Sequence, residues 1–253
     1  MVNPNEIALD VEDNANYGYG GVGNDQVFGT AGKDQLWGDD KTVNQLMGGD
    51  DLLRGYGGED IIFGQEGDDV LYGDEAIDVL IGGWGDDKVF GGDDDDVIWG
   101  DDKVRDATAD VDGTAEHMGE QAGKDKLYGE GGDDIIYGGH LDDKIHGGEG
   151  ADIIYGEGGE DTIWGDEGND KIKAGYGWDT VFGGAGCDEI YVYDGGDVVW
   201  LGDCEDDVSD PHPTQDLYIY GTGRDPENWV VVMDFWLEQA KPWNRICPRP
   251  SKH

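Results

Sequence analysis

A nine-residue phrase that recurs along most of the chain is its most constraining feature. Between Gly147 and Lys173 it is written three times, as GGEGADIIY, GEGGEDTIW and GDEGNDKIK. Each copy opens on glycine, has aspartate at its sixth position and an aliphatic residue at its eighth. Fifteen regular units and three units of other lengths occupy residues 20–200, interrupted at residues 100–118. A repeat this strict predicts a solenoid, in which similar units stack on one another.

The two halves of each unit predict different local structures. The first six residues are rich in glycine and acidic residues and predict a turn, and the last three, such as IIY or TIW, predict a short strand. Strand side chains alternate between faces, so the eighth residue points away from the seventh and ninth. We expect the eighth residues, aliphatic in every unit, to form the core: Val27, Leu36, Leu46, Leu53, Ile62, Leu71, Leu80, Val89, Ile98, Leu127, Ile136, Ile145, Ile154, Ile163, Ile172, Val181, Ile190 and Val199.

A single three-residue strand cannot bury its apolar side alone, so two units must face each other. The predicted fold is therefore all-β, a flattened parallel β-roll of two sheets, with about 18 residues per turn and about nine turns roughly 4.8 Å apart. We expect a short N-terminal cap at residues 1–19, the β-roll at 20–200 with its insertion at 100–118, and a non-repeat C-terminal cap with strands at 201–253.

The three cysteines of the chain stand in no metal-ligand spacing. Cys204 and Cys247 both lie in the expected C-terminal cap and are a candidate disulfide, which would leave Cys187 as a free thiol.

The charge of the chain restricts its partners. Sixty acidic residues face sixteen basic ones, for a net charge of -44, so a folded form needs multivalent cations or a basic partner. Nucleic acid is disfavoured by like charge, and no run of eighteen apolar residues predicts a membrane span. Composition alone also allows a disordered acidic chain, but disorder does not explain aliphatic residues held in register.

The sixth position carries the chemistry. Aspartates stacked about 4.8 Å apart along one edge repel one another, and a cation between consecutive turns removes that repulsion. Hard oxygen ligands favour calcium over zinc or copper. The candidate carboxylate ligands are Asp25, Asp34, Asp51, Asp60, Asp69, Asp78, Asp87, Asp96, Asp125, Asp134, Asp143, Asp152, Asp161, Asp170, Asp179, Asp188 and Asp197.

Glycine suits the same site, because such turns need positive φ and because backbone carbonyls must approach an ion without an intervening Cβ. The candidate glycines of the metal site are Gly129, Gly132, Gly147, Gly150, Gly156, Gly159, Gly165, Gly168, Gly183 and Gly186.

The motif resembles the nonapeptide GGxGxDxUx of RTX proteins, the hemolysin-type calcium-binding repeats; GGEGADIIY and GGAGCDEIY match it fully. The resemblance implies a right-handed parallel β-roll in which loop carbonyls and the aspartates of two turns share each calcium ion. Asp134 and Asp152 would flank one ion, and Asp143 and Asp161 the next, on the opposite edge. About ten to fifteen ions are implied. Weaker units are expected where the fourth or first glycine is replaced, by Ala76, Asp94, Leu141, Ala174 and Val192.

The outward residues distinguish the two sheets. If the insertion preserves the alternation of units, one sheet has apolar residues at both outward positions on five consecutive turns. Such a patch exceeds what monomers usually expose and predicts self-association into a dimer or filament, or docking on a larger surface; the alternative is that the insertion or the C-terminal segment covers it. The residues are Ile61, Phe63, Val79, Ile81, Val97, Trp99, Ile135, Tyr137, Ile153 and Tyr155.

No HExxH, GxSxG or P-loop motif is present, so no enzyme is predicted. The favoured function is a calcium-dependent structural or assembly module outside the cell or at its surface, in a surface layer, matrix, adhesin or filament; the chain begins without a recognisable secretory signal. The alternative is a calcium-dependent carbohydrate- or substrate-binding accessory module of a secreted enzyme system. In that case sugars would stack on exposed tryptophans, namely Trp37, Trp99, Trp164 and Trp200.

Overall fold

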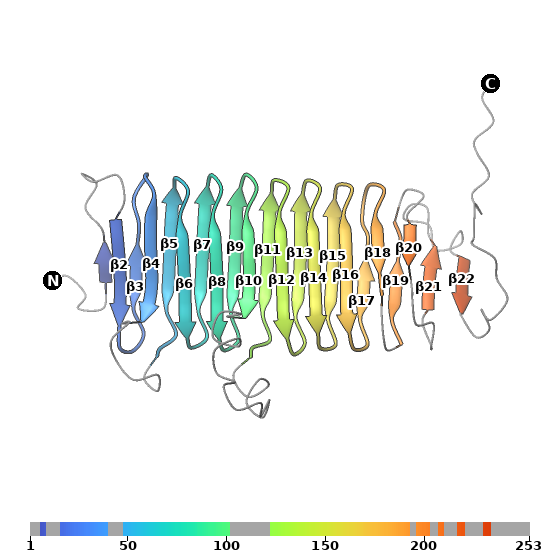
Figure 1. Ribbon diagram of the computed structural model, residues 1–253, viewed down its shortest axis with the longest axis horizontal. Helices are drawn as coiled ribbons and strands as arrows, with labels where there is room; N and C mark the ends of the chain where they lie inside the picture. Colours follow the sequence, from blue (N-terminus) through green and yellow to red (C-terminus); the bar gives the residue numbers. More distant parts are fainter. Residues whose placement is uncertain are drawn as a thin grey trace, which may run out of the picture.

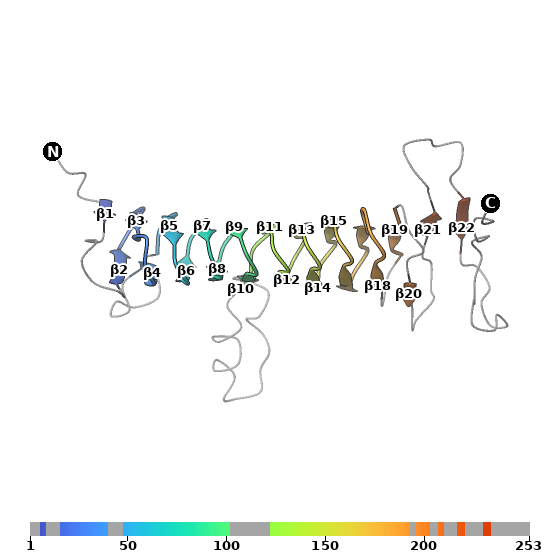
Figure 2. The ribbon, with the colours of Figure 1, turned by 90° about the horizontal axis from the view of Figure 1, so that it is seen from above.

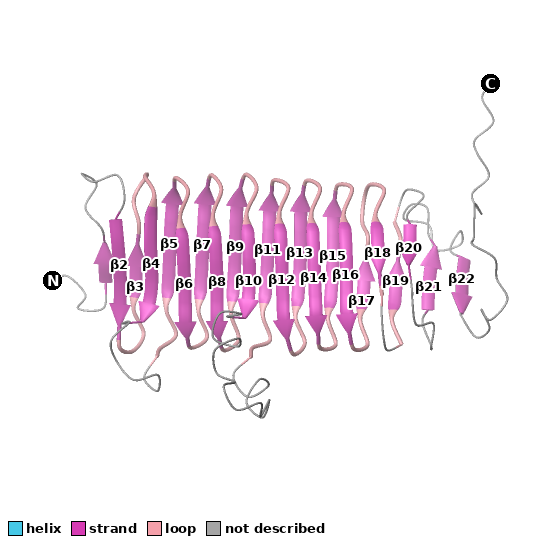
Figure 3. Ribbon diagram, viewed as in Figure 1, coloured by secondary structure: helices cyan, strands magenta, loops and turns pink. Residues whose placement is uncertain are grey.

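A flattened rod of β-strands forms the structured part of the chain (Figures 1 and 2). The computed structural model describes residues 6–8, 16–39, 48–101, 122–192, 196–202, 207–209, 217–220 and 230–233. These residues form strands and no helix (Figure 3), and hence no helix that could span a membrane. Successive strands run in opposite directions and alternate between two layers, which Figure 2 shows as two rows. The predicted all-β parallel solenoid is therefore confirmed.

The two layers are two sheets, named here sheet A and sheet B. Nearly all of their strands pair in parallel, which a coil allows because each strand meets its neighbour one full turn later. Sheet A contains β1 (Glu6–Ala8), β3 (Gln26–Phe28), β5 (Leu52–Gly57), β7 (Val70–Glu75), β9 (Lys88–Asp93), β11 (Lys126–Gly131), β13 (Lys144–Glu149), β15 (Thr162–Glu167), β17 (Thr180–Phe182), β19 (Val198–Trp200), β21 (Leu217–Tyr220) and β22 (Val230–Met233). Sheet B contains β2 (Asn16–Gly21), β4 (Asp34–Asp39), β6 (Ile61–Glu66), β8 (Val79–Trp84), β10 (Val97–Asp101), β12 (Ile135–His140), β14 (Ile153–Gly158), β16 (Lys171–Tyr176), β18 (Glu189–Tyr191) and β20 (Asp207–Ser209).

The insertion preserves the alternation of units. β10, before it, pairs with β12, after it, and aligns Val97 with Ile135 and Trp99 with Tyr137. The ten apolar residues predicted to share one sheet all lie on β6, β8, β10, β12 and β14 of sheet B. Each of the ten is half-buried. We call this surface the sheet B apolar face; it ends where Ile153 meets Lys171 on the next turn.

The strands are longer than the sequence predicted. Most have six residues instead of three and run from the seventh position of one unit to the third of the next, as in β12. The ladder between β12 and β14 continues past the first glycine, aligning Gly139 with Glu157. A parallel ladder needs only backbone donors and acceptors, so glycines that indicate a turn by composition remain within it. Only the fourth to sixth positions form the turn.

The core is a double row of aliphatic side chains between the sheets. Every predicted eighth-position residue that the structure describes is fully buried, and only Leu46 lies outside the described residues. The first-position residues Ala174, Val192 and Leu201 join the same core. The side chain at the first position therefore points inward.

Strands continue into both segments that were expected to be caps. β1 and β2 pair with β3 and β4 at the N-terminal end. At the C-terminal end, β20 and β21 extend sheets B and A, and β22 is antiparallel to β21. The regular coil thus reaches beyond the units that the motif identifies.

Cys187 is disulfide-bonded, so its predicted free thiol is wrong. Cys204 and Cys247 lie outside the described residues.

Adjacent isoleucines on β14 test the assignment of the two faces. Ile154 is fully buried whereas Ile153 is half-buried on the outer face. Replacing Ile154 by alanine should cost about 2 to 5 kcal/mol of stability in calcium, because it opens a cavity between the sheets. Ile153→Ala should cost less than about 1 kcal/mol. Guanidinium unfolding followed by circular dichroism measures both, and equal losses would contradict the assigned faces.

Candidate metal centre

The sixth-position aspartates are buried at the turns. All seventeen candidates lie in described residues and are at most 7% exposed. Each turn binds the next through them: the backbone N–H of Asp134 donates to Oδ1 of Asp152 over 2.8 Å, and that of Asp143 donates to Oδ1 of Asp161 over 2.9 Å. The structure thus places side by side the two pairs of aspartates that the resemblance assigns to shared ions.

The second carboxylate oxygen has no protein donor. In most of these aspartates Oδ2 is buried and accepts no hydrogen bond, which costs free energy unless another group satisfies it. Asp34 differs, because its Oδ2 accepts from the backbone N–H of Thr30 and its Oδ1 is left without a donor. The aspartates with an unsatisfied Oδ2 are Asp25, Asp51, Asp60, Asp69, Asp78, Asp87, Asp96, Asp125, Asp134, Asp143, Asp152, Asp161, Asp170 and Asp179.

The first-position glycines let a backbone carbonyl oxygen and this atom come close together. A Cβ added to Gly147 would lie 2.3 Å from Oδ2 of Asp152 and 2.6 Å from the carbonyl oxygen of Gly165. The same two kinds of oxygen, a carboxylate Oδ2 and a first-position carbonyl one turn later, crowd the Cβ position at other predicted glycines, namely Gly129, Gly156, Gly165 and Gly183.

The fourth-position residues take a left-handed backbone and meet the carbonyl of the preceding turn. A Cβ on Gly150 would lie 1.8 Å from the carbonyl oxygen of Gly132. Positive φ holds at all the predicted fourth-position glycines, Gly132, Gly150, Gly159, Gly168 and Gly186. Three of the weaker units keep the same conformation without glycine, at a cost in strain, because φ is 77° at Ala76, 77° at Asp94 and 71° at Leu141.

These oxygens fit calcium. No cluster of three or more His, Cys, Asp or Glu side chains occurs among the described residues, so carboxylates alone cannot complete a site. Calcium takes six to eight oxygen ligands and accepts backbone carbonyls beside carboxylates. Asp134 and Asp152 would hold an ion together with loop carbonyls such as that of Gly132. The bound ion supplies positive charge to carboxylates that have no cationic partner at the turn.

Burial raises the pKa of many of these carboxyl groups, and a backbone N–H bond only partly offsets this rise. The pKa of Asp143 rises to about 10, with the Asp125 carboxylate adding to the effect of burial. The pKa rises to about 8 in Asp60, Asp69, Asp96, Asp125 and Asp161, to about 7 in Asp51, Asp78, Asp134 and Asp170, and to about 6 in Asp152 and Asp179. Without a cation, folding at neutral pH must therefore neutralise many of these groups with protons.

Two further aspartates, which the sequence analysis did not single out, also accept a backbone N–H from another turn. Asp39 accepts the backbone N–H of Glu66 on Oδ2, and Asp101 accepts that of His140 on Oδ2, over 3.1 and 2.7 Å. Each stands in a WGDDK segment just before residues that the structure does not describe. The segment WGDDK occurs twice in the sequence, and this repetition could have identified an aspartate that bonds to another turn.

Aromatic stacking bears on the carbohydrate alternative. Trp164 lies between His146 and Phe182, with ring centroids 4.2 and 5.5 Å away. Trp37 lies between Tyr19 and Phe63 at 4.6 and 5.7 Å. Both faces of these two rings are covered, so a sugar could not stack on them.

Trp99 stacks on Tyr137 and Trp200 on Phe182. Among the described residues, the tryptophan that is most exposed is Trp178, which is 63% exposed in the loop before β17 and which the sequence analysis did not name.

A protein-family model matches most of the chain. The family model for the RTX calcium-binding nonapeptide repeat (4 copies) matches residues 12–40, 47–80, 72–102, 121–139, 141–172 and 173–207. The search of curated proteins found no match. Among solved structures, the chain is similar to a hyperactive, Ca²⁺-dependent, β-helical antifreeze protein from an Antarctic bacterium, with 18% identity, coverage of 85% of this chain and 86% of that chain, and a TM-score of 0.41.

Removing one carboxylate charge tests the site. Asp152→Asn keeps the size of the side chain but weakens the ligand set on either side of its turn. We expect one or two fewer bound ions and a higher calcium midpoint for folding. Native mass spectrometry and a calcium titration measure these. Glu149→Gln, at an exposed position nearby, removes the same charge and should change neither; a shift of equal size in both variants would argue against Asp152 as a ligand.

The pH dependence of the calcium-free chain tests the buried carboxyl groups. Their folded pKa is raised above the ordinary value, so they contribute stability at low pH that is lost as pH rises through about 6 to 10. In the presence of a calcium chelator, the β-sheet signal in circular dichroism should therefore be stronger at pH 5 than at pH 8. A calcium-free chain that is better folded at pH 8 would show that these groups are not buried without calcium.

Proposed function

Since the chain belongs to the RTX calcium-binding nonapeptide-repeat family, we propose that it is a structural module that folds on calcium outside the cell or at its surface. The support is the row of buried aspartates whose Oδ2 lacks a protein donor. Each of these carboxylates needs a cation before the turns can stack without repulsion. Because some units are weakened, about ten to fifteen ions would meet this need.

Calcium acts in this proposal as a folding ligand. A site that exists only when consecutive turns are stacked binds the folded state and not the unfolded one, so binding energy becomes folding energy. Extracellular calcium modules work at about 10⁻⁴ to 10⁻³ M. A chain with a net charge of -44 would remain expanded at low calcium and become a rigid rod at the millimolar level.

The role of the rod is assembly, in a surface layer, matrix, adhesin or filament. The observation that carries this is the sheet B apolar face, which is apolar at both outward positions over five consecutive strands. The ring of Tyr137 stacks between those of Trp99 and Tyr155, at 5.6 and 4.7 Å, which stiffens the face. Contact with a second copy of the chain, or with a larger apolar surface, would shield the sheet B apolar face from water. The proposal assigns no enzymatic activity.

The sheet B apolar face can be tested by adding charge. In calcium, Ile135→Lys combined with Ile153→Lys should abolish association because it buries two ammonium groups, while calcium-dependent folding stays intact. Light scattering and sedimentation velocity report association, and circular dichroism reports folding.

The matched control combines Ile77→Lys with Ala151→Lys, two exposed loop positions, which add the same charge and should leave association unchanged. A sheet B variant that assembles like the parent would show that this face is not the contact. A parent that stays monomeric in calcium would remove the assembly role.

A further inference from the structure

The outer face of sheet A carries three parallel columns of side chains. The seventh positions give a lysine column at Lys88, Lys126 and Lys144, in register on consecutive turns. The ninth positions give an aromatic seam. The second positions alternate between an acidic residue and glycine, along Asp74, Gly92, Glu130, Gly148 and Asp166. The face is therefore basic along one side, apolar in the middle and acidic along the other.

The aromatic seam is continuous. Ring centroids are 4.8 Å apart from Tyr72 to Phe90 and from Phe90 to Tyr128, and 5.2 Å apart from Tyr128 to His146. It continues through Trp164 to Phe182, and the planes of neighbouring rings lie within 9° of one another along its length. Stacking locks the rings against one another, so the middle of the face is rigid before any partner arrives.

The lysine column has no counter-charge among the described residues. The side chains of Lys88, Lys126 and Lys144 make no hydrogen bond or ion pair with the part of the chain that the structure describes. Like charges directly opposite each other on adjacent strands are destabilising. With sixty acidic residues against sixteen basic ones, three consecutive unpaired lysines indicate a face that meets negative charge from outside.

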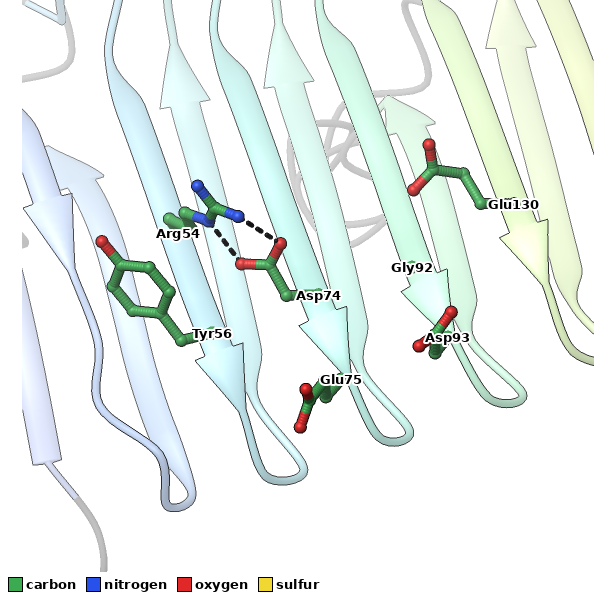
Figure 4. A pocket seen from close by; sticks show the side chains of 7 residues that line it. All are labelled: Arg54, Tyr56, Asp74, Glu75, Gly92, Asp93 and Glu130. Atoms are coloured by element: carbon green, nitrogen blue, oxygen red, sulfur yellow. Dashed lines mark hydrogen bonds and ion pairs between the residues drawn. The ribbon is translucent and has the colours of Figure 1, made fainter.

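The acidic side offers that charge in the form of a pocket. A surface pocket of about 290 Å³ lies between Asp74 and Glu130, and Glu75 and Asp93 also line it (Figure 4). Arg54 also lines this pocket, but its guanidinium is engaged by the Asp74 carboxylate through Nε and Nη2. Glu75, Asp93 and Glu130 have no cationic partner among the described residues. The pocket can therefore accept an ammonium group.

We propose that the outer face of sheet A binds the same face of a second copy, around a two-fold axis that runs along the aromatic seam. This axis reverses the strand direction and keeps the turns aligned, so each seventh position faces the second position of the same turn in the partner copy. Lys88 then faces the pocket beside Gly92, Lys126 faces Glu130, and Lys144 faces Gly148, which lies between Glu130 and Asp166 on the neighbouring strands. The same contacts recur in the other direction, as a two-fold axis requires.

The alternatives match the face less well. A two-fold axis along the strands would set lysine against lysine. A linear polyanion would meet the acidic column as well as the lysines. The face from β7 to β17 measures about 30 Å by about 20 Å, so a dimer would bury roughly 1,200 Å² in total, at the lower end of specific interfaces. The contact lies on the sheet opposite to the sheet B apolar face and does not depend on it.

Charge exchange tests the proposal. The variants are made in the background that carries Ile135→Lys and Ile153→Lys, so that sheet B cannot contribute, and are measured by sedimentation equilibrium in saturating calcium. Lys126→Glu alone and Glu130→Lys alone should each weaken the dimer at least about tenfold. The combined variant should recover it, because each copy then offers the reversed charge to the other. Added salt should weaken the parental dimer.

Lys33→Glu is the control, since Lys33 pairs with Glu59 away from this face, and it should not change the dimer. A background protein that stays monomeric in calcium would overturn the proposal, as would a charge-exchanged variant that stays as weak as the single ones. Binding of a model polyanion such as alginate to a monomer would also overturn it. Loss of association on sheet B alone would leave this dimer in place, so the two proposals fail separately.

Discussion

In the proposed function, the fold depends on a cation that removes the repulsion between aspartates stacked from turn to turn. Most of these aspartates accept a backbone N–H of the preceding turn on Oδ1, which fixes their position and leaves Oδ2 buried near backbone carbonyls. Taking a carboxylate out of water at such a spot is unfavourable unless positive charge lies beside it. Calcium bound beside these carboxylates would supply that charge.

The glycines follow from the same constraint. At the first position, a side chain would occupy the space next to Oδ2, and at the fourth it would strike the carbonyl of the preceding turn. The aliphatic double row between the sheets supplies the hydrophobic contribution but is only one residue wide in each sheet. A core this narrow leaves the rod dependent on its turns, which explains why a chain with 36% hydrophobic residues can still form an extended sheet structure.

Much of the fold and of the candidate site could be predicted from the sequence, because every turn of a solenoid repeats the same local structure. The aliphatic eighth position predicted the buried row, and the two-unit turn predicted which strands pair, even across the insertion where Val97 meets Ile135. The sixth position identified aspartates that the structure buries, including Asp143 and Asp161. Each of these predictions depends on the periodicity of the repeat, which is visible in the sequence alone.

The remaining features depend on contacts between turns, which a single unit does not show. Composition placed the strand boundary after three residues because glycine at the first position looks like a turn, whereas the ladder passes through it. Asp101, which bonds to a turn beyond the insertion, and the disulfide of Cys187 depend on long-range geometry. The alternation of acid and glycine along Asp74, Gly92 and Glu130 becomes a surface only when the turns are stacked.

The most direct test of the central claim is a calcium titration of the chelator-treated chain at neutral pH, with circular dichroism and native mass spectrometry on the same samples. The account predicts little β-sheet signal without calcium. As ions bind, it predicts a cooperative gain that saturates with about ten to fifteen ions on each chain. A calcium-free chain with the full β-sheet signal at neutral pH, or saturation without bound calcium, would contradict it.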